Sequence, residues 1–190
     1  MARAGLTTER LAQAGAELAD EVGFDQVTVS ALARRFDVQV ASLYSHVKSS
    51  ADLKARIAVV ALQELAELGA EALAGRARRD ALIALANVYR DYAHEHPGRY
   101  AAARFNPASA SADFLAAGGR HAEMTRAILR GYDLGEPAQT DAIRLLGSVF
   151  HGYVSLELAG SFSHSKPDSS ESWPRILDAL DTLLSDWTSS

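Results

Sequence analysis

The sequence contains no cysteine, which excludes disulfide bonds and thiolate metal sites. It also lacks an uncharged apolar run of about 18 residues, and its first ten residues lack the apolar core of a signal peptide. These absences predict a protein of the cytoplasm with no membrane contact. Motifs for a phosphate-binding loop, a nucleophile elbow or paired catalytic carboxylates are missing as well. The absence of these motifs predicts that the protein is not an enzyme and has no cofactor. His94 and His96 would point to different faces of a helix, so we expect no metal site either.

The charges of the chain are distributed unevenly. The 190 residues carry a net charge of −5, and 48% of them are hydrophobic, enough for one or two modest cores. Within residues 28–56, however, five Lys and Arg residues face only two Asp residues. This segment is therefore the one suited to a polyanion, and a symmetric dimer would present it twice.

The positive segment contains two short predicted helices separated by a tight turn, between Thr28 and Lys48. Thr28 is placed to cap the first helix, because its hydroxyl can accept a free helical N–H. Asp37 falls at the bend, where a left-handed residue is needed, and Asp tolerates that conformation. Leu43 and Val47 are spaced to face inward from the second helix. This pattern predicts a helix-turn-helix.

A helix is predicted on each side of this segment. Apolar residues recur every three or four positions between Thr7 and Val22, which indicates an amphipathic helix that ends at Gly23. Ser49 and Asp52 resemble a capping box that starts a helix from Ser50 to about Leu73. That helix is too long for a small core, so we expect it to join two domains, residues 1–49 and 50–190.

The rest of the chain is also predicted to be helical. Helices are expected over about 97–105, 112–132, 137–160 and 173–187, with a polar loop over 163–172. Gly118 and Gly119 inside one of them suggest a kink or a close approach of another segment. The predicted fold class is therefore all-α, with about nine helices.

Two groups of residues resemble a known family. The run Leu43-Tyr44-Ser45-His46-Val47-Lys48, together with Val38 and the helix start at Thr28, resembles the DNA-binding domain of the tetracycline-repressor (TetR) family over residues 7–65. The segment Phe150-His151-Gly152-Tyr153 is similar to the WHG-type C-terminal domain of some members, with Phe150 at the tryptophan position. The chain departs from the family at three positions. It has Asp37 where Gly is common, Gln39 where Ser or Thr is common, and Ser50 where Lys is common, so the phosphate contact of that lysine is missing.

The resemblance implies a homodimeric regulator, a repressor that a small molecule releases from a double-stranded DNA operator. Side-chain chemistry assigns phosphate contacts to Thr28, Tyr44, His46 and Lys48. The start of the second helix is best placed for base edges, through Gln39, Val40, Ala41 and Ser42. The small apolar Val40 and Ala41 predict contacts with thymine methyl groups. Arg3 is expected to belong to a disordered tail, the alternative being an arm that reaches DNA.

Two further sites are expected in the remainder of the chain. Polar groups among apolar walls suggest an effector pocket, although each residue alone also suits a core or surface position: Tyr89, Tyr92, Arg104, His121, Met124 and His151. A four-helix bundle between two subunits is expected from a stripe of small residues, Ser148, Gly152 and Ser155, and from an apolar stripe, Trp173, Leu177, Leu180 and Leu184. The alternative function is a helical small-molecule binding protein or enzyme in which the N-terminal hairpin is only scaffold.

Overall fold

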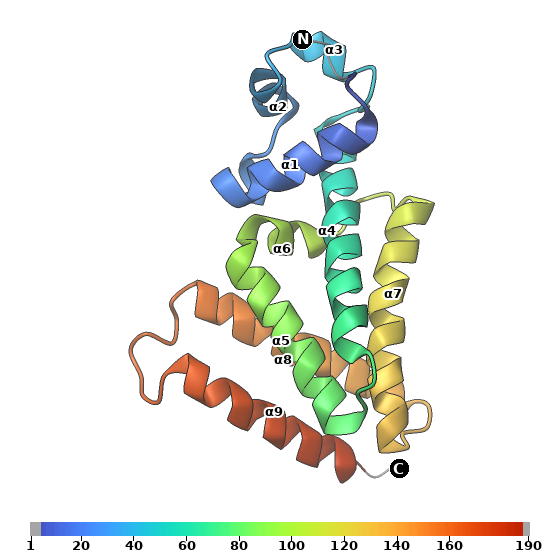
Figure 1. Ribbon diagram of the computed structural model, residues 1–190, viewed down its shortest axis with the longest axis vertical. Helices are drawn as coiled ribbons and strands as arrows, with labels where there is room; N and C mark the ends of the chain where they lie inside the picture. Colours follow the sequence, from blue (N-terminus) through green and yellow to red (C-terminus); the bar gives the residue numbers. More distant parts are fainter. Residues whose placement is uncertain (1–4, 188–190) are drawn as a thin grey trace. The chain divides into compact units, whose positions relative to one another are not determined.

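The computed structural model describes residues 5–187, so Arg3 lies outside the described residues. Within that range the chain forms helices and no strand, which confirms the predicted all-α class with nine α-helices (Figure 1). The α-helices are α1 (Thr8–Val22), α2 (Val29–Arg35), α3 (Val40–Leu43), α4 (Ser50–Leu73), α5 (Arg78–Glu95), α6 (Pro97–Ala103), α7 (Ala112–Leu129), α8 (Ala138–Leu158) and α9 (Ser169–Ser185). Two short 3-10 helices, η1 (Phe24–Gln26) and η2 (Arg130–Tyr132), complete the fold.

The chain forms two compact units, neither of which is one continuous stretch of sequence. The first unit comprises the chain up to Glu64 together with Glu95–Gly118, and the second comprises Leu65–His94 and the chain from Gly119 onward. Helix α4 begins in the first unit and ends in the second. The domain boundary expected between residues 49 and 50 stays a prediction.

The first unit is built around one apolar core. Leu11 of α1, Leu32 of α2, Leu43 of α3 and Ile57 of α4 are all buried in it. Ala102 of α6, which lies far along the chain, is buried in the same core. The predicted amphipathic helix and the predicted helix-turn-helix therefore share one centre, and α6 adds to it.

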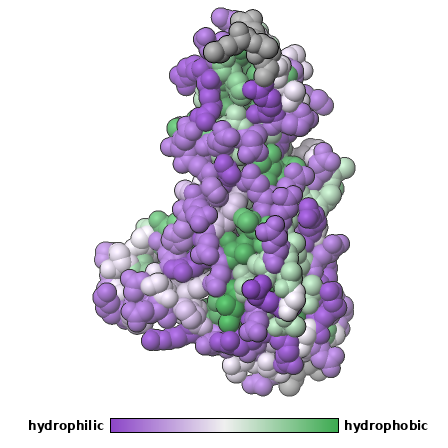
Figure 2. Space-filling model, viewed as in Figure 1, coloured by the Kyte–Doolittle hydropathy of each residue, from purple (hydrophilic) through white to green (hydrophobic). Residues whose placement is uncertain are grey.

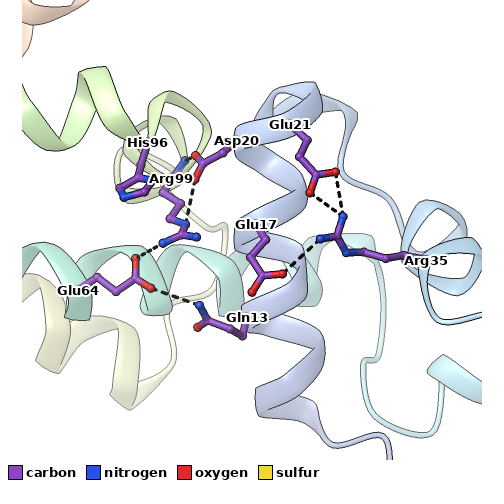
Figure 3. A network of polar contacts seen from close by, with 8 residues as sticks. All are labelled: Gln13, Glu17, Asp20, Glu21, Arg35, Glu64, His96 and Arg99. Atoms are coloured by element: carbon purple, nitrogen blue, oxygen red, sulfur yellow. Dashed lines mark hydrogen bonds and ion pairs between the residues drawn. The ribbon is translucent and has the colours of Figure 1, made fainter.

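Helix α6 lies against α1 at unusually short range (Figure 1). A Cβ atom added at Gly98 would come within 1.9 Å of the carbonyl oxygen of Ala19, so only glycine fits there. The Asp20 carboxylate accepts the backbone N–H of Arg99 at 2.8 Å and lies 3.1 Å from His96 Nδ1 (Figure 3). Arg99 in turn reaches Glu64 of α4 at 3.1 Å. Residues 96–99 thus fasten α6 to both α1 and α4.

The core of the second unit is rich in aromatic side chains. Phe150 of α8 packs edge-on against Trp173 of α9, with ring centres 6.0 Å apart, and Tyr153 lies 4.8 Å from the same indole. The indole N–H of Trp173 donates to Asn87 Oδ1 of α5 at 2.9 Å. A buried polar group is therefore satisfied, and α5, α8 and α9 are held together.

An ion pair lies beside this core. Arg90 of α5 makes two hydrogen bonds of 2.8 Å to the carboxylate of Glu157 on α8, and His94 Nε2 lies 2.9 Å from the same group. The Glu157 side chain is only 7% exposed. The Arg90 hydrogen bonds hold the pKa of Glu157 at about 2, against an ordinary value of 4.5. The carboxylate is therefore ionised at every physiological pH.

Two local expectations are corrected. Helix α9 begins at Ser169 rather than at residue 173, because the Asp168 side chain accepts the Ser170 N–H and caps the helix within the stretch expected to be a polar loop. Gly118 and Gly119 lie within the continuous helix α7, and nothing lies within 4 Å of a Cβ placed at either one. The close approach expected at these glycines is therefore absent.

None of the described helices is long and apolar enough to cross a membrane. Most residues on the face shown in Figure 2 are hydrophilic.

Gly98→Ala should destabilise the first unit by about 2 kcal/mol or more, because the new methyl group meets the backbone of α1 rather than a side chain that can move. Urea unfolding followed by circular dichroism would measure the loss. Gly119→Ala is the matched control, since its methyl group enters open space in the interior of a helix. It should be neutral or stabilising by up to about 1 kcal/mol. Equal effects of both substitutions would contradict the close packing of α6 on α1.

Glu157→Gln should destabilise the protein by about 2–3 kcal/mol at neutral pH, since it removes a carboxylate whose folded pKa lies far below its unfolded one. A carboxyl group whose pKa is lowered in the folded state stabilises the fold at pH values above its unfolded pKa of 4.5. This stabilisation is lost as the pH falls toward the folded pKa of about 2. The gap between wild type and variant should therefore be constant above about pH 5 and narrow below it. Unfolding measured across this range, with the exposed Glu123→Gln as control, would show it. A gap that does not depend on pH would contradict the prediction.

Candidate nucleic-acid interface

Helix α2 begins as the sequence predicts. The Thr28 side chain accepts the backbone N–H of Ala31 at 3.1 Å, which caps the helix. Leu32 and Ala33 then point into the core of the first unit. Because the cap uses only the acceptor side of the Thr28 hydroxyl, its hydrogen can still be donated to another group.

The turn between α2 and α3 depends on Asp37. This residue has a φ of 52°, in the left-handed region, as expected from its position. After it, the N–H of Val38 returns to the carbonyl of Ala33 at 3.0 Å. The chain therefore reverses within a few residues and enters α3 at Gln39.

Helix α3 is shorter than expected, with only Val40–Leu43 in regular α-helix. The Ser45 hydroxyl donates to the Ser42 carbonyl at 2.7 Å, and the His46 N–H bonds the Leu43 carbonyl three residues back. These local bonds replace part of the α-helical pattern, so Tyr44–His46 form a turn. Leu43 and Val47 are nevertheless both buried, as predicted.

We refer to Gln39–Lys48 as the recognition segment, because it carries most of the predicted DNA contacts. Its exposed side chains are those of Gln39, Val40, Ala41, Ser42, Tyr44, Ser45 and Lys48, while His46 is half-buried. Tyr44 is 53% exposed, a large fraction for an aromatic residue next to an apolar core. The structure thus brings seven of the eight predicted contact residues onto one short segment, and the eighth, Thr28, lies at the start of α2.

The recognition segment is anchored at its C-terminal end. At its end, the Lys48 N–H donates to Asp52 Oδ2 at 2.8 Å, and Ser49 Oγ accepts the Asp52 N–H at 3.1 Å, as in the predicted capping arrangement. The Thr8 hydroxyl of α1 donates to the His46 carbonyl at 3.3 Å. The segment is therefore tied to α1 and α4 through backbone groups, which leaves its side chains available.

Ion pairs within the first unit engage most of the positive side chains of residues 28–56. Arg35 pairs with Glu21 at 2.7 Å and with Glu17 at 3.3 Å, and the Glu21 hydrogen bond raises the pKa of its guanidinium (Figure 3). Lys54 pairs with Asp25, and Arg56 pairs with Asp52.

Two cations of this stretch are left for a partner. Arg34 of α2 and Lys48 are exposed and form no ion pair with any other residue in the range 5–187. Lys48 belongs to the predicted contacts. Arg34 was not predicted as a contact from the sequence, because its only signal there is its charge. Its neighbour Arg35 carries the same charge, and only the structure shows that Arg35 has ion-pair partners.

The residues of the predicted effector pocket lie in both units. Tyr89, Tyr92, His121, Met124 and His151 belong to the second unit, and Arg104 belongs to the first. The Tyr89 hydroxyl lies 2.6 Å from His121 Nδ1, so these two are in direct contact. Arg104 lines a cavity of about 470 Å³ beside Phe24 and Phe105, and none of the other five predicted pocket residues lines that cavity.

The residues of the predicted dimer interface fall into two classes. Trp173, Leu177, Leu180 and Leu184 are buried in the core of the second unit within a single chain, and their part in a contact between subunits stays a prediction. Ser148 is exposed and Gly152 and Ser155 are half-buried on α8, where nothing lies within 4 Å of a Cβ placed at Gly152.

No group of three or more His, Cys, Asp and Glu side chains comes together as metal ligands in the part of the chain that the structure describes.

Two protein-family models match the chain. The family described as "Bacterial regulatory proteins, tetR family" matches residues 11–57, which include α2, α3 and the recognition segment. The family described as "Tetracyclin repressor-like, C-terminal domain" matches residues 82–180, about half of the chain.

Individual relatives agree with these matches. The chain is 35% identical to the uncharacterized HTH-type transcriptional regulator Rv0681 of Mycobacterium tuberculosis over 159 residues, 83% of this chain and 72% of that protein. A solved structure of a protein with unknown function from Rhodococcus sp. RHA1 has the same fold, with a TM-score of 0.80 at 20% identity over 98% of this chain and 100% of the other. A TetR variant from Acinetobacter baumannii AYE, in complex with minocycline, shares the fold with a TM-score of 0.74 at 21% identity over 98% and 100% of the two chains.

The capped α2, the left-handed turn at Asp37 and the exposed recognition segment form a helix-turn-helix. Together with the family matches over both parts of the sequence, they show that the chain belongs to the tetR family of bacterial regulatory proteins and is a DNA-binding transcriptional regulator.

Proposed function

We propose that this regulator is a repressor that binds a double-stranded DNA operator as a homodimer in the cytoplasm and is released from it by a small molecule. The observation that carries the DNA part of the proposal is the recognition segment, whose side chains are exposed while Leu43 and Val47 hold it in the core. A segment that is held through its backbone and its apolar face presents a fixed set of side chains to a groove.

Within the proposal, the side chains divide by chemistry. Tyr44, His46, Lys48 and the Thr28 hydroxyl bind phosphate oxygens, which set the position on DNA. Gln39, Val40, Ala41 and Ser42 lie at the start of α3 and meet base edges. Arg34 adds a phosphate contact, because it is exposed and has no carboxylate partner among residues 5–187.

The homodimer is proposed to use the uncovered face of α8. The small residues Ser148, Gly152 and Ser155 let a second helix approach closely, and Leu156 of the same helix is 48% exposed. Leu183 of α9 is also exposed, at 45%. Exposed leucines next to small side chains suit a helix–helix contact with a second copy.

The effector is proposed to bind in the second unit, beside Tyr89 and His121. A phenol and an imidazole in contact next to the apolar core can bind a polar group of an otherwise apolar ligand. The relative bound to minocycline shows that a protein of this fold takes up a small organic molecule. Because α4 belongs to both units, a change in its position would reach the recognition segment.

Gel-shift assays with DNA from beside the protein's own gene, at two salt concentrations, test the proposed function. A labelled fragment should be shifted specifically in the presence of excess random DNA, and the affinity should fall steeply as salt rises, because Lys48 and other cations displace counterions. If no fragment is bound in preference to random DNA, the operator proposal fails and the alternative, a ligand-binding protein or enzyme with the hairpin as scaffold, is favoured.

Substitutions in the recognition segment separate phosphate from base contacts. Tyr44→Ala should weaken binding to operator and random DNA alike, by about three- to tenfold, since a phosphate hydrogen bond carries no sequence information. Val40→Ala should change the preference among operator variants at a T·A pair, with little effect on random DNA. Tyr44→Phe, which keeps the ring and removes only the hydroxyl, should weaken binding about as much as Tyr44→Ala, because the hydroxyl makes the phosphate hydrogen bond. If Val40→Ala, like Tyr44→Ala, weakened binding to operator and random DNA equally, these roles would be refuted.

A further inference from the structure

The first unit contains a cavity of about 710 Å³ that none of the functions above uses. Its walls come from the N-terminal half of α1, from Lys48 and about the first four turns of α4, and from residues 108–113, which lead into α7. All of these belong to the first unit. The volume lies within the range of about 300–1,000 Å³ typical of sites for small organic ligands.

The cavity has an apolar wall and a polar rim. Its apolar lining consists of Ala12 of α1 and Ala51, Ala55, Val59 and Val60 of α4, with Ala108. Side chains that can donate and accept hydrogen bonds surround this wall, namely Thr8, Gln13, Gln63, Ser109 and Ser111. A few polar groups around an apolar wall favour an amphipathic ligand over a fully polar one.

The charged residues that line the cavity are three acids, Glu9, Asp52 and Asp113, and two bases, Lys48 and Arg56, so the lining carries one more negative than positive charge and favours a cation. Asp52 is already engaged, because it accepts the Arg56 guanidinium at 3.1 Å and the Lys48 N–H at 2.8 Å. Glu9 and Asp113 also line the cavity, and neither forms an ion pair with any residue that the structure describes. Hydrogen bonds from its own N–H and from the Thr7 hydroxyl lower the pKa of Glu9, so it stays ionised.

We propose that this cavity binds an amphipathic organic amine, with its apolar body against Ala12, Ala55 and Val59 and its ammonium group toward Glu9 and Asp113. The site is separate from the effector pocket proposed beside Tyr89, and it does not depend on that proposal. An anion of the same size would meet the Glu9 and Asp113 carboxylates, with Lys48 as the one lining cation that forms no ion pair among residues 5–187, and is disfavoured.

A ligand in this cavity would contact residues that support the recognition segment. Lys48 lines the cavity and ends that segment, and the Thr8 hydroxyl, which also lines the cavity, donates to the His46 carbonyl. Bound amine would therefore act on the recognition segment directly.

Fluorescence titration of the full-length protein without DNA tests the site with two dansyl probes of matched size. Dansylcadaverine carries an ammonium group, and dansyl-aminocaproic acid carries a carboxylate in its place. The amine should bind with enhanced, blue-shifted emission, at least about tenfold more tightly than the acid. Equal affinity of the two probes would overturn the proposed ligand class. Because no DNA is present, the result does not depend on whether the operator proposal holds.

Variants place the probe in the cavity. Ala55→Trp should abolish binding of the amine by filling the apolar wall, while Ala70→Trp, at an exposed alanine of the same helix, should not. Glu9→Gln and Asp113→Asn should each weaken the amine by about two- to fivefold and leave the acid unchanged or bound more tightly. Glu67→Gln, at an exposed carboxylate of α4 outside the cavity, is the control for charge. Because Glu9 and Asp113 are exposed, their variants keep the test valid even if Ala55→Trp fails to fold; amine binding unchanged in both would refute the site.

Discussion

The contact between α6 and α1 determines the composition of the first unit. Gly98 lies so close to the Ala19 carbonyl that no side chain fits between the two helices, and Asp20 binds the backbone and side chain of residues just after the turn at His96. This contact holds α6 against α1, although 76 positions separate Asp20 from His96.

The same unit shows how an acidic protein can present a positive surface to DNA. Five cations occupy residues 28–56, but tertiary ion pairs engage Arg35, Lys54 and Arg56. Exposed ion pairs of this kind contribute little to stability, about 0–1 kcal/mol each. Their consequence here is spatial, because they leave Arg34 of α2 and Lys48 after α3 as the exposed cations whose charge is available.

The second unit uses its apolar residues internally. Helix α9 carries a regular apolar stripe, and that stripe is covered by α5 and α8 through Trp173 and its neighbours. The surface that we propose for a second subunit therefore consists of small residues and a few exposed leucines. A carboxylate–guanidinium pair, Glu157 with Arg90, adds a polar connection between α5 and α8 that weakens only when acid protonates the carboxylate.

The sequence by itself determined the features that depend on local bonds: the caps at Thr28 and Ser49, the left-handed turn at Asp37 and the inward positions Leu43 and Val47. Their partners lie within a few residues, so residue type and spacing are sufficient. Only the tertiary structure decided which cations stay available, that the α9 stripe is core, that α6 joins α1, and that α1, α4 and residues 108–113 enclose a cavity. These depend on contacts between residues far apart in the chain, and an apolar stripe or a charge has the same pattern whether its partner is in the same chain or outside it.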